Sequence, residues 1–124
     1  MSKTTLYDVH ADGKGLVMVT GSISDSAVVS GLGFTMTDES SPAGTYTITF
    51  DDQYNALISC VVSLEHGSDS SFANGWTVQV SGYTTGANPT IRFVSFDETF
   101  ALNDLTSDTN IHFIAIFRNT AVTT

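Results

Sequence analysis

Three histidines and one cysteine are the side chains of this sequence best suited to metal binding or nucleophilic catalysis. His10, His66 and His112 are far apart, with no histidine or cysteine neighbour at the short spacing of zinc sites. Cys60 lies within an apolar run, with no basic residue near it in sequence to activate its thiol. We therefore interpret Cys60 as a small core residue, and the sequence predicts no metal or cofactor site. His10 and His66 are interpreted as loop residues, and His112 as a partly buried packing residue.

Serine and acidic residues leave two kinds of hydrolytic site to consider. A Ser-His-Asp triad is defined by geometry and stays open, although the Gly-x-Ser-x-Gly elbow of many such enzymes is absent. Glycosidases need two carboxyl groups about 5–9.5 Å apart across a cleft. The adjacent pairs Asp51-Asp52 and Asp97-Glu98 each follow a phenylalanine and are typical of turns at strand ends. The other acidic residues are scattered, without the ligand spacing of a calcium loop. We predict that the protein is not an enzyme.

Aromatic residues are the remaining signal for a ligand, because their rings stack on sugars. The candidates are Tyr7, Tyr54, Trp76 and Tyr83. Trp76 alternates with Val78 and Val80, which favours core packing. Tyr83 lies in a glycine-rich turn and is the best candidate for an exposed ring. Carbohydrate binding therefore stays an alternative.

Composition limits the class of protein. The chain has 124 residues, which fits one domain, and a net charge of -9 from 4 basic and 13 acidic residues. Such a charge argues against nucleic acid and against anionic membranes as partners. Only 14% of residues are charged, below the usual value of about 25%. The surface is therefore rich in neutral polar residues, as in extracellular or particle-bound β proteins. We expect neither a signal peptide nor a membrane-spanning segment.

The segment from Gly44 to Asp52 shows most clearly how the chain folds. Tyr46, Ile48 and Phe50 alternate with threonines, which predicts a strand with one buried face. Similar segments cover residues 16–20, 27–36, 57–65, 76–81, 91–96 and 110–119, separated by turns. The pattern predicts an all-β fold, an antiparallel β-sandwich of about eight strands that is jelly-roll-like. Residues 11–124 form one domain, and residues 1–10 are an N-terminal arm or edge strand.

In residues 57–65, Ile58, Cys60, Val62 and Leu64 are expected on one face. Residues 16–19 and 111–116 are apolar on both faces, which indicates central strands or an interface. The residues predicted to contact another subunit or a larger assembly are Leu16, Val17, Val19, His112, Ile114 and Ile116.

Two segments resemble a pattern in small structural proteins of tailed phages. The first runs from Val29 through Gly31-Leu32-Gly33-Phe34 to Thr37, and the second is Gly44-Thr45-Tyr46-Thr47-Ile48-Thr49-Phe50-Asp51-Asp52 with Tyr54. The final strand, from His112 to Phe117, is similar to the last strand of these proteins, although Arg118 and Asn119 replace the glycine that often closes it. The resemblance covers about half the chain and carries over no functional residue. It implies capsid decoration (cement) proteins or modules of head and tail fibres.

The resemblance implies a non-enzymatic β-sandwich protein of the virion. We expect a protein on the capsid exterior that stabilises the capsid, binds the major capsid protein and forms a homotrimer. The alternatives are a receptor-binding or fibre-tip module, with exposed aromatic residues around Tyr54 and Tyr83, and a carbohydrate-binding β-sandwich. A carbohydrate-processing enzyme would require a cleft with convergent carboxylates.

Overall fold

The computed structural model of the chain describes residues 16–67 and 75–118. These ranges form eight strands and no helix, and so contain no helical segment able to cross a membrane. The strands are β1 (Leu16–Ile23), β2 (Val28–Gly31), β3 (Phe34–Glu39), β4 (Thr45–Phe50), β5 (Ala56–His66), β6 (Thr77–Thr84), β7 (Thr90–Phe96) and β8 (Thr109–Arg118). The predicted arm or edge strand in residues 1–10 lies outside the described residues.

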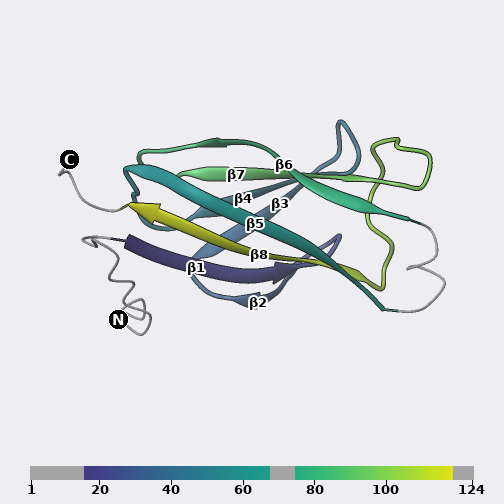
Figure 1. Cartoon of the computed structure of the whole chain (residues 1–124), viewed down its shortest axis with the longest axis horizontal. Coiled ribbons are helices and arrows are strands. Elements are labelled where there is room, and N and C mark those ends of the chain that lie inside the picture. The colour runs from purple at the N-terminus through teal and green to yellow at the C-terminus, as the bar shows by residue number, and fades with distance from the viewer. Residues whose placement is uncertain (1–15, 68–74, 119–124) are drawn as a thin grey trace.

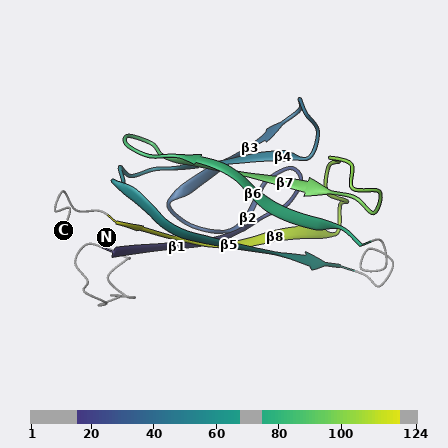
Figure 2. The same ribbon diagram turned by 45° about the horizontal axis from the view of Figure 1, so that its top comes forward.

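The strands form two antiparallel sheets of four, with the orders β2-β1-β8-β5 and β3-β4-β7-β6 (Figure 1). Figure 2 shows the two layers, with β1, β5 and β8 in one and β3, β4 and β7 in the other. This confirms the predicted all-β antiparallel sandwich. Within it, the β1–β2, β3–β4 and β6–β7 connections join neighbours in one sheet, and the other four connections cross between sheets. β1 and β8 are central, as the sequence predicts for strands that are apolar on both faces.

The segment from residue 27 to residue 36, predicted as one strand, is two strands in different sheets. β2 pairs with β1, whereas β3 pairs with β4. The chain crosses between the sheets at Gly31-Leu32-Gly33, where both glycines have positive φ and Leu32 is 87% exposed. A side chain at Gly31 would lie 2.7 Å from the carbonyl oxygen of Thr20, so the crossing needs a glycine there. With this segment divided in two, the described residues contain eight strands. The predicted number is therefore reached without a strand in residues 1–10.

The predicted alternation of β5 was wrong at its start. Cys60, Val62 and Leu64 pack against the core as expected, but Ile58 is 48% exposed and Leu57 packs inward instead. The ladder with β8 shifts register between Leu57 and Ser59, so Ile58 is the extra residue of a β-bulge. A bulge changes the face on which the preceding residues lie, and a simple alternation cannot reveal it.

Aromatic rings from both sheets form the centre of the core. Phe50 of β4 meets Phe117 of β8 edge to face, with ring centroids 4.9 Å apart. Phe34 of β3 and Phe93 of β7 contact Phe113 of β8, at 5.1 and 5.6 Å. Such pairs stabilise a core by about 0.5–1.5 kcal/mol beyond the apolar area that they bury.

Tyr46 ties three segments together at one end of the sandwich. Its hydroxyl donates to Asp25 Oδ1 in the β1–β2 loop at 2.7 Å and accepts from the backbone N–H of Leu105 at 2.8 Å. Burial raises the pKa of the Tyr46 phenol, so the hydroxyl stays protonated and can donate. Two loops that are distant in sequence are thereby fixed to β4.

We expect Gly44→Ala to destabilise the protein much more than Gly86→Ala. Both glycines have positive φ (82° and 102°), where a Cβ costs about 1 kcal/mol. At Gly44 the Cβ would also lie 2.6 Å from the carbonyl oxygen of Asn103, whereas at Gly86 it would meet nothing within 4 Å. This clash should add about 1–3 kcal/mol. Urea unfolding of the two variants measures the difference, and equal losses would contradict this account of Gly44.

Candidate functional site

The outer face of the sheet β2-β1-β8-β5 carries an apolar patch. Its residues alternate with the core residues of β1, β5 and β8, and we call them the outer patch: Leu16, Met18, Val61, Ile114 and Ile116. Ile114 pairs with Val61, and Ile116 with Met18, so the patch runs continuously across three strands. Val61 is 60% exposed and Ile114 is 43% exposed, while the other three are half-buried.

Four of the six residues predicted at an interface lie on this face. Leu16, Ile114 and Ile116 belong to the outer patch, and His112 lies beside it on β8. Val17 and Val19 do not, because they face the opposite sheet and pack in the core. The prediction that β1 and β8 are apolar on both faces was right, but only alternate residues of each strand are accessible. Met18 and Val61 were not among the predicted interface residues, and the strand register places both on this face.

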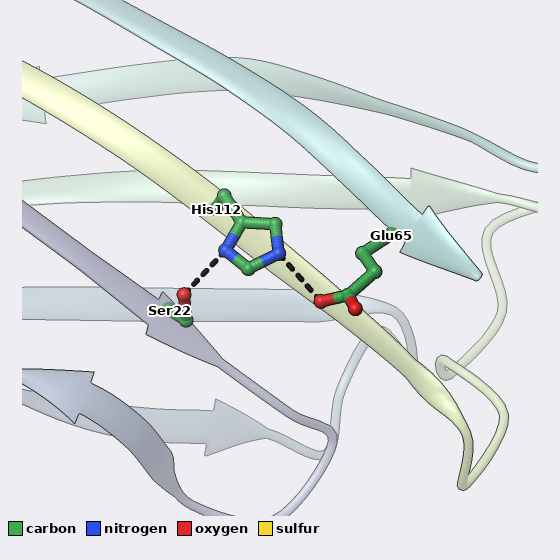
Figure 3. A network of polar contacts seen from close by, with 3 residues as sticks. All are labelled: Ser22, Glu65 and His112. Carbon is green, nitrogen blue, oxygen red and sulfur yellow. Dashed lines mark hydrogen bonds and ion pairs between the residues drawn. The ribbon is translucent and has the colours of Figure 1, made fainter. Parts of the chain in front are cut away.

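Ser22, His112 and Glu65 form a polar row at one end of the outer patch (Figure 3). They come from β1, β8 and β5, and His112 bridges the other two. Its Nδ1 shares a hydrogen bond with Ser22 Oγ, and its Nε2 contacts Glu65 Oε1 at 2.7 Å. The hydrogen bond from His112 lowers the pKa of Glu65, helped by a hydrogen bond from Asn110 and by the charge of His112. Glu65 is therefore held as a carboxylate that keeps the imidazole in place.

This row has the residue types of a hydrolase triad but not its surroundings. Ser22 is only 6% exposed and sits in the middle of the sheet, paired with Ser30 on one side and His112 on the other. A serine nucleophile needs backbone N–H groups that converge on the developing oxyanion. In a central strand those groups bond the neighbouring strands instead. The row is better suited to forming a polar border of the outer patch than to catalysing acyl transfer.

Three aspartates converge at the end of the sandwich near Tyr46. Asp25, Asp38 and Asp104 place carboxylate oxygens within 4.8 Å of one another. Oxygen ligands of this kind can hold a hard cation, but Asp25 already accepts from Tyr46 and Asp104 from the N–H of Gly44 at 2.7 Å. Burial, followed by the charges of Asp25 and Asp104, raises the pKa of Asp38. This cluster could not be predicted from the sequence, because the three residues are far apart in it and only the fold brings them together.

The structure also places the other residues considered as candidates from the sequence. Cys60 packs against the core, and burial raises the pKa of its thiol to about 11, which opposes thiolate chemistry. Asp97 accepts hydrogen bonds from the hydroxyl and N–H of Thr99 and from the N–H of Ala101, which lower its pKa to about 2. Asp97 therefore closes a turn, as predicted. Trp76 is half-buried just before β6, and Tyr83 is 57% exposed.

Comparison of the chain with protein-family models, with curated proteins and with solved structures found no match.

We expect Asp38→Asn to raise the melting temperature at neutral pH. The folded pKa of Asp38 lies above its unfolded value of about 3.9, so the ionised form destabilises the folded state. The gain from asparagine is complete above the folded pKa and disappears as the pH falls below about 3.9, where the carboxyl is protonated in both states. Thermal unfolding at low and high salt measures it, and salt should reduce it. Glu98→Gln, which removes an exposed charge from the same loop as Asp104, should show no such gain. A loss of stability in Asp38→Asn would contradict the view that burial and the charges of Asp25 and Asp104 destabilise the ionised Asp38.

A double-mutant cycle should show that Ser22 and His112 are energetically coupled. His112→Leu leaves the buried Ser22 hydroxyl without its partner, which costs about 1–2 kcal/mol. In a Ser22→Ala background that penalty is absent, so the same change should cost about 1 kcal/mol less. Urea unfolding of the four proteins gives the coupling energy. Additive effects would show that the hydrogen bond does not contribute to stability.

Proposed function

We propose that this protein is a non-enzymatic structural protein of a phage virion that decorates and stabilises the outside of the capsid as a homotrimer. The observation that carries the proposal is the outer patch on the two central strands of one sheet. Exposed apolar side chains gathered on one face favour a protein partner. The resemblance of residues 29–37, 44–54 and 112–117 to capsid decoration proteins favours the major capsid protein, and neighbouring copies of this chain, as that partner.

The surroundings of the outer patch suit a protein interface. Stable interfaces have an apolar centre and a polar rim. Here the rim contains Thr20, Ser59 and the Ser22–His112–Glu65 row. Burial of about 100 Å² of apolar surface contributes about 2.5 kcal/mol to the free energy of binding. Burial of the outer patch therefore favours docking. A ligand that binds only the assembled capsid stabilises that state by mass action.

The alternatives have less support. A fibre-tip module was expected to expose aromatic residues around Tyr54 and Tyr83, but Tyr54 is 3% exposed and its ring stacks on Phe117 at 4.4 Å. A glycosidase requires carboxyl groups about 5–9.5 Å apart on two sides of a cleft. The three converging aspartates lie nearer together than that, and two of them already accept hydrogen bonds from the protein.

Copy number in purified particles tests this function. Gel densitometry against the major capsid protein should give on the order of hundreds of copies per particle, because decoration repeats with the lattice. A handful of copies would indicate a fibre component instead. Absence of the protein from particles would overturn the proposal.

Charged substitutions in the outer patch should abolish docking without unfolding the protein. Ile114→Asp and Val61→Asp each place a carboxylate in the apolar centre of the interface, and we expect particle binding to fall at least about a hundredfold. Leu32→Asp is the matched control, because Leu32 is an exposed apolar residue outside the patch. Pelleting with stripped particles measures binding, and sedimentation velocity measures the trimer. Wild-type binding by both patch variants would exclude this face.

A further inference from the structure

The opposite sheet has a hollow that the proposed docking face does not use. It lies on the outer side of β4, β6 and β7 and has a volume of about 350 Å³. The residues that line it are Thr47, Gly82, Tyr83, Thr84, Thr90 and Arg92. Because it is on the other sheet from the outer patch, a ligand could occupy it while the outer patch is covered.

The hollow exists because glycine stands next to arginine in the ladder. Thr47, Arg92 and Gly82 are successive partners across β4, β7 and β6, so they lie on the same face. A Cβ at Gly82 would meet nothing within 4 Å. The missing side chain therefore leaves open space beside the Arg92 side chain.

Arg92 supplies the positive charge of the hollow. Its Nε donates to Ser81 Oγ at 3.0 Å, which orients the guanidinium, and it forms no ion pair with the residues that the structure describes. A guanidinium matches the geometry of a carboxylate and binds it through two parallel hydrogen bonds. One cation in the lining of the hollow, in a chain of net charge -9, suits a singly charged ligand and not a polyanion.

Hydroxyl groups surround this cation. Thr84 Oγ1 and Thr90 Oγ1 are hydrogen-bonded at 2.8 Å, and Thr84 Oγ1 also accepts from the backbone N–H of Thr90 at 3.0 Å. These bonds fix the two side chains, and each hydroxyl keeps capacity for another partner. Thr47 adds a third hydroxyl on the other side of Arg92. Fixed hydroxyls of this kind recognise the hydroxyl groups of a sugar.

We propose that the hollow at Arg92 binds a carboxylate-bearing sugar, such as a uronic acid residue, with the carboxylate on the guanidinium and sugar hydroxyls on Thr47, Thr84 and Thr90. The volume admits one sugar residue, and the open side allows the remainder of a glycan to continue across the sheet. An acidic glycan at a cell surface would then hold the protein by this sheet.

Titration with sugars by amide NMR tests the site. D-Glucuronate should shift the signals of residues around the hollow, with a dissociation constant in about the millimolar range. Glucose, which lacks the carboxylate, and acetate, which lacks the ring, should each bind at least about tenfold more weakly. Equal binding of glucose or acetate would overturn the assignment to an acidic sugar, as would the absence of any shift with glucuronate.

Variants locate the binding. Arg92→Gln should weaken glucuronate binding at least about tenfold, and Gly82→Leu should block it by filling the hollow. Arg118→Gln is the matched control, because Arg118 lies on β8 of the other sheet and should leave affinity unchanged. Unchanged affinity in both hollow variants, or an equal loss in Arg118→Gln, would place the ligand elsewhere. The unfolding transition of each variant confirms that the protein is folded.

Discussion

The packing of Phe50 against the β8 aromatic residues is the contact on which the rest of this structure depends. Phe50 comes from one sheet and Phe113 and Phe117 from the other, with ring centroids 6.3 and 4.9 Å from that of Phe50. No helix in the described ranges packs between or over the sheets, so these ring contacts are a main link between the two layers. The requirement to bury these rings fixes the register of β4 and β8, since a shift of one residue would turn every ring outwards.

A core that takes alternate residues leaves the other half of each central strand free for other roles. On β8 that half includes Ile114 and Ile116, which form the outer patch with residues of β1 and β5. On β4 it consists of threonines, and on β7 it includes Thr90 and Arg92. The sandwich therefore presents two faces of different chemistry, one suited to proteins and one to polar ligands. Their separation by the core allows each to change without disturbing the other.

The sequence predicts this fold well where the alternation is regular and poorly where the backbone departs from it. Tyr46, Ile48 and Phe50 are fully buried, as their spacing predicts. Ile58 is not, because a bulge inserts a residue, and Leu32 is exposed because the chain changes sheet. His112 can be identified as a candidate from its residue type alone. Its contacts with Ser22 and Glu65 can be predicted only from the registers of β1 and β5 with β8. The same limit applies to the aspartate cluster, whose members approach only through the topology.

The Tyr46 hydroxyl also has a consequence for the motion of the molecule. One phenol contacts the β1–β2 loop through Asp25 and the β7–β8 loop through Leu105, beside the hydrogen bond from Gly44 to Asp104 of the second loop. Neither loop can lift from β4 without exposing the same buried hydroxyl group, so the two should open together as one cooperative unit. Segments separated by most of the chain thus share a single local opening equilibrium, and a change in either loop alters the dynamics of the other.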